Sequence, residues 1–205
     1  MSGDNPEDPK LSSRADPSQH EEGYLTGQLI VAMPTMMDPR FARTVIYLCA
    51  HNKDAAMGLV VNRLIGSLTF PDLLEQLGIE GHQADKDIRV HFGGPVESGR
   101  GFVLHSGDYQ QEGTLQVDPK VSLTATVDIL RDMADGRGPQ RSLLALGYAG
   151  WGEGQLDAEI QANAWLHVDA DDDLVFDADL DGKWERALNK LGIELSMLSG
   201  DAGHA

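Results

Sequence analysis

Cysteine, basic residues and long apolar runs are all scarce in this 205-residue sequence, and each scarcity excludes a class of protein. The single cysteine, Cys49, excludes an intrachain disulfide and is compatible with a reducing cytosol. The 16 Lys and Arg residues are outnumbered by 33 Asp and Glu residues, which leaves a net charge of −17. This charge argues against direct binding to nucleic acid or to an anionic membrane, because both require a basic surface.

The sequence also shows no segment with the pattern of a transmembrane helix or a signal peptide. Apolar runs such as 29–33 and 45–50 are far shorter than the roughly 18 residues that a spanning helix needs. Residues 1–22 hold six acidic and two basic residues and almost no large apolar ones, which indicates a disordered acidic tail rather than a signal peptide. We therefore expect a soluble, cytoplasmic protein with a single domain over residues 23–205.

A second acidic block lies near the C-terminus. Seven aspartates and no Lys or Arg fall between Asp169 and Asp181, a pattern typical of a solvated loop and strand edge. Residues 177–182 match the start of a calcium-binding loop, but Leu188 takes the position where a bidentate glutamate is needed. The chain also has neither a paired-histidine zinc motif nor a cysteine pair. We expect no metal and no other cofactor.

Short strand-like segments rich in Val, Ile, Leu and aromatic residues alternate with amphipathic helical ones. We expect strands at 25–33, 44–49, 57–62, 89–93, 102–105, 143–148, 165–168 and 174–176. We expect helices at about 70–77, 125–134, 155–164 and 183–191. The first helix carries a capping box, Thr69 with Asp72, and ends at Gly78. Tight hairpins early in the chain and helices later predict an α/β fold with one mixed sheet flanked by about four helices.

Four stretches are too specific to be explained by secondary structure. They are LIVAMPTMMDPRFARTVIYLCAHNKDAAMGLVVN (29–62), GGPVESGRGFVLH (93–105), LGYAGWGEGQLDAEIQANAWL (146–166), and KWERALNKLGI with the final AGHA. In this order and spacing they resemble the AlgH family, also called YqgE-like, over about residues 24–205. The resemblance implies a soluble bacterial protein whose mixed sheet is curled and partly barrel-like. It implies no known reaction, because the family's transcriptional-regulator label comes from a genetic link to alginate production in one lineage.

Cys49 and His51 are the first candidate pair. In an extended strand they would share one face, roughly 6.6 Å apart, and an imidazole beside a thiol favours the nucleophilic thiolate. However, Cys49 lies in the apolar segment VIYLCA, where a free cysteine is usually part of the core. The family pattern here is Cys-Glu-His-Asn, and Ala50 replaces the acid, which weakens any catalytic triad. Core packing, a reactive thiol and a ligand-lining role all stay open.

The glycine-rich segment 147–154 connects an expected strand to an expected helix. It is not a phosphate-binding loop, because no Lys-Ser/Thr pair follows, and we expect Trp151 at its tip. Gln155, Glu159 and Asn163 then recur at every fourth position and form one polar stripe, and all three match the family motif GQL…EI…NAWL. The stripe is either a solvent-facing side of the helix or, together with Trp151, one wall of a pocket.

Segment 93–105 predicts a hairpin with a loop of about six residues. Arg100 in that loop either clamps a carboxylate or phosphate or pairs with a nearby acid, whereas His105 ends an apolar strand and is expected to be structural. Asn62, at the end of the first family stretch, is a further candidate for ligand binding.

Our leading hypothesis is a regulatory or accessory protein that binds a small molecule or a protein partner without catalysis. It rests on the lack of a recognisable set of nucleophile, base and orienting group. The candidate ligand-binding residues are Asn62, Arg100, Trp151, Gln155, Glu159 and Asn163. The alternative is a thiol-dependent or hydrolytic enzyme that uses Cys49, His51 and Glu159. A third hypothesis, a regulator that acts directly on DNA, is disfavoured by the net charge.

Overall fold

The computed structural model describes residues 24–80 and 87–195, so the acidic tail and the final AGHA lie outside the described residues. The strands are β1 (Gln28–Ala32), β2 (Val45–His51), β3 (Ala56–Val60), β4 (Leu64–Thr69), β5 (Arg89–Phe92), β6 (Val96–Ser106), β7 (Thr114–Gln116), β8 (Val121–Thr124), β9 (Ser142–Trp151) and β10 (Trp165–Asp169). The helices are α1 (Phe70–Gln76), α2 (Val127–Ala134), α3 (Gln155–Gln161), α4 (Asp172–Phe176) and α5 (Lys183–Lys190). None of these helices has the length and apolar character needed to span a membrane.

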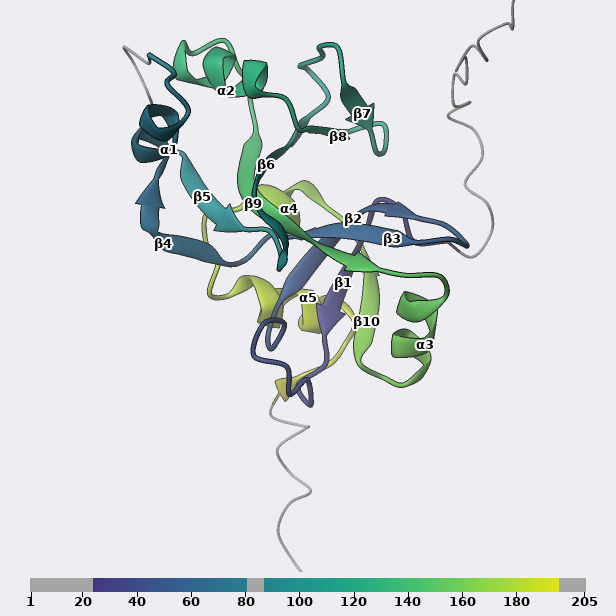
Figure 1. Ribbon diagram of the computed structural model, residues 1–205. Helices are drawn as coiled ribbons and strands as arrows, with labels where there is room; N and C mark the ends of the chain where they lie inside the picture. The colour runs from purple at the N-terminus through teal and green to yellow at the C-terminus, as the bar shows by residue number, and fades with distance from the viewer. Residues whose placement is uncertain (1–23, 81–86, 196–205) are drawn as a thin grey trace, which may run out of the picture.

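All the described strands belong to one mixed, curled sheet, as expected for an α/β fold. Its main path runs β10-β1-β2-β3-β9-β6-β8-β7, and β4 and β5 branch from it because β5 pairs with β9 in parallel. The long strand β9 joins the two halves of the molecule, since its first residues pair with β5 and β6 and its last residues pair with β3. Figure 1 shows α1 and α2 beside one half and α3 and α5 beside the other.

The expected hairpin at 93–105 is wrong, because β5 and β6 do not pair with each other but lie on opposite sides of β9. The chain crosses β9 at Gly93 and Gly94, where the two backbones almost touch. A Cβ atom added to Gly94 would lie 2.0 Å from the carbonyl carbon of Tyr148, and one on Gly93 would lie 2.2 Å from the Gly147 oxygen. Only glycine permits so close a crossing.

The central strands are apolar on both faces, which is why they appear in the sequence as nearly continuous hydrophobic runs. In β2, Val45, Tyr47 and Cys49 pack into one core cluster with α5, whereas Ile46 and Leu48 pack into another with α3. A third cluster lies under α1 and α2. The sheet therefore has core on both sides, and helices cover its faces.

Most of the helices and strands lie where local sequence signals predicted them. The Thr69–Asp72 capping box is present, and α1 ends before Gly78, which has φ +66°. The strand expected at 174–176 is wrong, since these residues belong to α4, where the Asp171 side chain caps the Leu174 N–H at 2.8 Å. Aspartates in a first turn favour a helix because they interact well with its N-terminal dipole. The short strands β4, β7 and β8 and the helix α4 were not anticipated.

Candidate functional site

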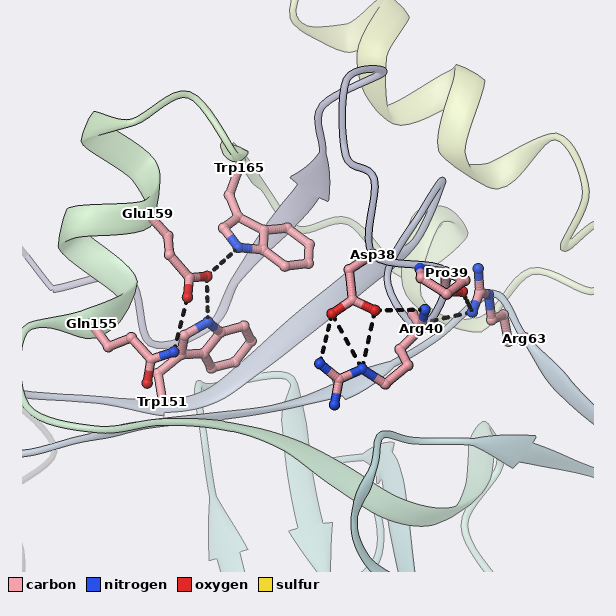
Figure 2. Close-up of polar contacts among 8 residues, drawn as sticks. All are labelled: Asp38, Pro39, Arg40, Arg63, Trp151, Gln155, Glu159 and Trp165. Atoms are coloured by element: carbon pink, nitrogen blue, oxygen red, sulfur yellow. Dashed lines mark hydrogen bonds and ion pairs between the residues drawn. The ribbon is translucent and has the colours of Figure 1, made fainter.

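Glu159 on α3 lies at the centre of a closed cluster of hydrogen bonds, which we call the indole clasp (Figure 2). Its Oε2 accepts from the indole N–H of Trp151 at 2.9 Å and from that of Trp165 at 2.8 Å, and its Oε1 accepts from Gln155 at 2.9 Å. The two indole rings pack edge to face at 5.9 Å and are almost fully buried. The carboxylate therefore ties α3 to β9 and β10, and both of its oxygens are already engaged.

The polar stripe predicted on this helix divides into two roles. Gln155 belongs to the clasp and also accepts from the backbone N–H of Gly152 at 3.0 Å, which closes the turn before α3. Asn163 lies just after the helix with φ +56°, a conformation that asparagine tolerates better than most residues. None of the three residues of the stripe lines the pocket described below; Gln155 and Glu159 hold α3 in place, and Asn163 lies at its end.

A loop that follows β1 packs against the clasp, and its arrangement could not be inferred from local sequence. Phe41 contacts the Trp165 ring edge to face at 5.7 Å. Arg63 holds the loop through the backbone carbonyls of Pro39, Arg40 and Ala42, at 3.0, 2.7 and 2.6 Å. Figure 2 shows the exposed Asp38–Arg40 pair next to these contacts. The polar contacts here are internal to the protein, which indicates a structural role for this loop.

Cys49 and His51 do not share a face. The pairing of β2 with β3 shifts between Leu48 and Ala50, and this bulge interrupts the alternation of side chains. Cys49 is 2% exposed in the core, and burial raises the pKa of its thiol to about 12. A thiol in that state is neutral near pH 7 and is not a nucleophile. The geometry contradicts the predicted thiol–imidazole pair.

His51 faces α3 and the segment before β1 instead. Its Nδ1 accepts from the Leu25 backbone N–H at 3.1 Å, so the proton is on Nε2, which lies 3.5 Å from Asp157. Its ring also packs against Tyr24 at 5.1 Å. Asn62 is likewise engaged internally, because its amide accepts from Val45 N–H and donates to the Arg43 carbonyl, both at 2.9 Å. The expected structural role of His105 agrees with its buried contacts to Thr124 and Ser106.

Arg100 and Trp151 do meet, at a pocket of about 530 Å³ that we call the aromatic pocket. Strands β3, β6, β7, β8 and β9 contribute to it, and most of its lining is apolar or aromatic, including Met57, Phe102, Leu115, Tyr148 and Trp151. Phe102 and Tyr148 pack edge to face at 5.7 Å. Trp151 is not at a loop tip as predicted, since it is the last residue of β9 and pairs with Ala56.

A wide irregularity in β6 places Arg100 at the mouth of this pocket. Val96 pairs with Tyr148, and the next paired residue of β6, Gly101, pairs with Leu146. Residues 97–100 of β6 therefore lie opposite Gly147 alone and bulge out of the strand. The Arg100 guanidinium lies 5.1 Å from the Phe102 ring and 3.4 Å from the Glu97 carboxylate. Of the two alternatives for Arg100, the pairing with a nearby acid is the one present here, with Glu97 as the acid. The side chain remains 54% exposed, so its outer face is accessible to a ligand.

The aromatic pocket is thus assembled from two predicted residues and several that were not predicted. Cys49, His51, Asn62, Gln155, Glu159 and Asn163 do not line it. The missed residues Phe102 and Tyr148 lie in strand segments without a distinctive motif, and only the pairing of β6 with β9 brings their rings together. Chemically, the arrangement offers apolar and aromatic contact area, one arginine, and the Tyr148 hydroxyl.

Comparison with known proteins agrees with this architecture. The AlgH-like family model matches residues 29–196. A UPF0301 protein of Rhodospirillum rubrum is 57% identical over 187 residues, covering 91% of this chain and 97% of its own length. The solution structure of the AlgH protein from Pseudomonas aeruginosa is 42% identical with a TM-score of 0.75, covering 91% of this chain and 99% of that one. A Corynebacterium diphtheriae protein, DIP2367, shares the fold at 18% identity and a TM-score of 0.66, over 80% of this chain and 85% of its own. The chain belongs to the AlgH-like family.

Proposed function

We propose that this protein is a cytoplasmic accessory or regulatory protein that binds a small aromatic or apolar anion in the aromatic pocket. The observation that carries the proposal is the joining of an aromatic lining to one accessible arginine at the mouth. Small-molecule sites have this form, with mainly apolar walls, few polar groups and volumes of roughly 300–1,000 Å³. The pocket volume of about 530 Å³ lies within that range.

The charge of Arg100 favours an anionic group at the mouth of the pocket. Both side chains of the Arg100–Glu97 pair are exposed, and the distance between the guanidinium nitrogen and the carboxylate oxygen, 3.4 Å, is longer than in a close ion pair. Exposed pairs of this kind contribute only about 0.2–1 kcal/mol, so a ligand carboxylate or sulfonate can replace Glu97 at little cost. The ligand's apolar part would then contact Phe102, Leu115 and Tyr148.

Binding without chemical conversion is favoured over catalysis by the composition of the lining. Among the described residues that line the pocket there is no Ser, Cys, His or Lys, and only Glu97 and Tyr148 could transfer a proton. A hydrolytic or thiol-dependent reaction needs a nucleophile that is activated by an adjacent base. The buried thiol of Cys49 and the engaged carboxylate of Glu159 do not supply that pair.

Fluorescence titration with 1-anilinonaphthalene-8-sulfonate, an aromatic monoanion, tests the proposal. We expect saturable binding that Arg100→Gln weakens about tenfold, as is typical for loss of a hydrogen bond to a charged group. Arg131→Gln is the matched control, because Arg131 is equally exposed and also pairs with an acid three residues away, but on α2. Equal affinity of the wild type and the Arg100 variant, or equal weakening by both variants, would contradict the proposal.

A further inference from the structure

The mouth of the aromatic pocket carries two opposite charges side by side. Glu97 and Arg100 both belong to its lining, their carboxylate and guanidinium lie 3.4 Å apart, and about half of each side chain is exposed. A simple anion interacts favourably only with Arg100, and the nearby Glu97 carboxylate repels it. A ligand with its own adjacent pair of opposite charges interacts favourably with both groups. The mouth therefore favours a zwitterion over an anion.

The bulge in β6 fixes both members of this pair at the same rim of the pocket. Glu97 has φ +47°, a left-handed conformation that is costly for a residue with a Cβ atom. Such conformations persist where the surrounding structure imposes them, and they cluster at functional sites. The Arg100 guanidinium lies over the Phe102 ring at 5.1 Å, which ties the charged rim to the aromatic lining. A ligand bound at the rim can therefore reach charged and aromatic groups together.

The charge of the whole protein also distinguishes between ligand classes. The net charge of −17 repels anions over long distances, whereas a zwitterion has no net charge and escapes this repulsion. Below the rim, the lining offers apolar and aromatic side chains that suit one large apolar group. These are Met57, Phe102, Leu115 and Tyr148. The site thus combines a place for two adjacent charges with a place for one apolar side chain.

From the paired charges, the apolar lining and the acidic surface, we infer that the ligand of the aromatic pocket is an α-amino acid with a large apolar or aromatic side chain. The inference rests on the proposed function, because it uses the same contact between Arg100 and a ligand carboxylate. The ligand ammonium lies against Glu97, so the four charges alternate in sign and the Arg100–Glu97 pair is kept. A simple anion, in contrast, displaces Glu97 from Arg100.

NMR titration of the full chain with L-phenylalanine, at low ionic strength, tests the inference. Low salt is needed because exposed charges are screened over about 10 Å at 0.1 M. We expect saturable shifts of the backbone amides of residues 97–102. The matched ligand 3-phenylpropanoate lacks only the ammonium group and should bind about fivefold more weakly, the upper range for one exposed ion pair. Glycine lacks the side chain and should produce no saturable shift.

Three variants assign the two charged contacts. Glu97→Gln should weaken L-phenylalanine about fivefold but not 3-phenylpropanoate, so that the preference for the amino acid is lost. Asp128→Asn is the matched control, because Asp128 also precedes its arginine partner by three residues, but on α2 and outside the pocket lining. It should keep the preference. Arg100→Gln should weaken both ligands about tenfold.

The outcomes separate this inference from the proposed function. The inference is overturned if L-phenylalanine binds no more tightly than 3-phenylpropanoate, if glycine binds as tightly as L-phenylalanine, if Glu97→Gln keeps the preference, or if Asp128→Asn abolishes it. In each of these cases, binding of 3-phenylpropanoate that depends on Arg100 still supports the proposed function. Binding of both ligands that is independent of Arg100 contradicts the inference and the proposed function together.

Discussion

Replacing Glu159 by alanine removes the acceptor that two buried indoles share, and the cost follows from the geometry of the clasp. Trp151 is 6% exposed and Trp165 is 2% exposed, so both indole N–H groups lie in a largely buried site and lose their shared acceptor with the carboxylate. A hydrogen bond to a charged group contributes about 1.5–3 kcal/mol. Because both indoles use the same oxygen, the two losses overlap, and we expect the free energy of unfolding to fall by about 3 kcal/mol.

Two further variants test whether the clasp, rather than the size of the side chain, is responsible. Glu159→Gln keeps an amide oxygen for the indoles but turns its NH₂ group toward the donor of Gln155, so we expect a smaller loss of about 1 kcal/mol. Gln155→Ala removes two solvent-exposed hydrogen bonds, the one donated to Glu159 and the one accepted from the Gly152 N–H, and together these should cost only about 0.5 kcal/mol.

Urea unfolding followed by tryptophan fluorescence measures these differences directly, because all three tryptophans lie in the described structure. The expected order of destabilisation is Glu159→Ala, then Glu159→Gln, then Gln155→Ala, with similar slopes against urea. If Glu159→Ala lies within about 0.5 kcal/mol of the wild type, or if Gln155→Ala is as damaging, the clasp is not what holds α3 to the sheet.

Two further predictions concern buried groups that the sequence did not mark as unusual. Lys183 is fully buried with its ammonium donating to the Val61 and Val175 carbonyls at 3.1 and 3.0 Å, and burial lowers its pKa to about 8. Since the unfolded lysine keeps its proton to about pH 10.4, the unfolded state binds more protons between these values, and stability should rise with pH by up to about 3 kcal/mol. Lys183→Met should abolish that rise in urea titrations across this range, and equal pH slopes for the two proteins would refute the assignment. Cys49 should react with iodoacetamide about a hundredfold more slowly in the native protein than in urea, because alkylation requires local opening and a thiolate; comparable rates, measured by mass spectrometry, would restore the thiol-dependent enzyme as a candidate.

Structural features that depend on residues close together in the sequence could be predicted from the sequence. The strands β2, β3, β5 and β10 and the helices α1 and α5 lie close to their expected positions. Their signals, such as the Thr69–Asp72 capping box, act within about one turn of helix or a few residues of strand. The acid partner of Arg100 was predictable for the same reason, since Glu97 is only three residues away.

The candidate site was harder to predict because one inserted residue changes the direction of every later side chain. The shift in pairing between β2 and β3 separates His51 from Cys49, although their spacing in the sequence suggested a shared face. Glu159, which the polar stripe marked as a pocket residue, is bound instead by Trp151 and Trp165. Helical spacing places a side chain on one side of a helix but does not specify what packs against that side.

By itself, the amino-acid sequence determined the mixed α/β class and most strand and helix positions, because these follow from the period of its hydrophobic residues and from its capping residues. It also determined the family, through the four motif stretches. Tertiary structure alone decided that β5 and β6 flank β9 and that Arg100 reaches the aromatic pocket. These arrangements depend on pairings between segments that are far apart in the sequence, such as Phe102 with Ala145, which are 43 residues apart. Such pairings are selected by the packing of the whole sheet rather than by any local preference.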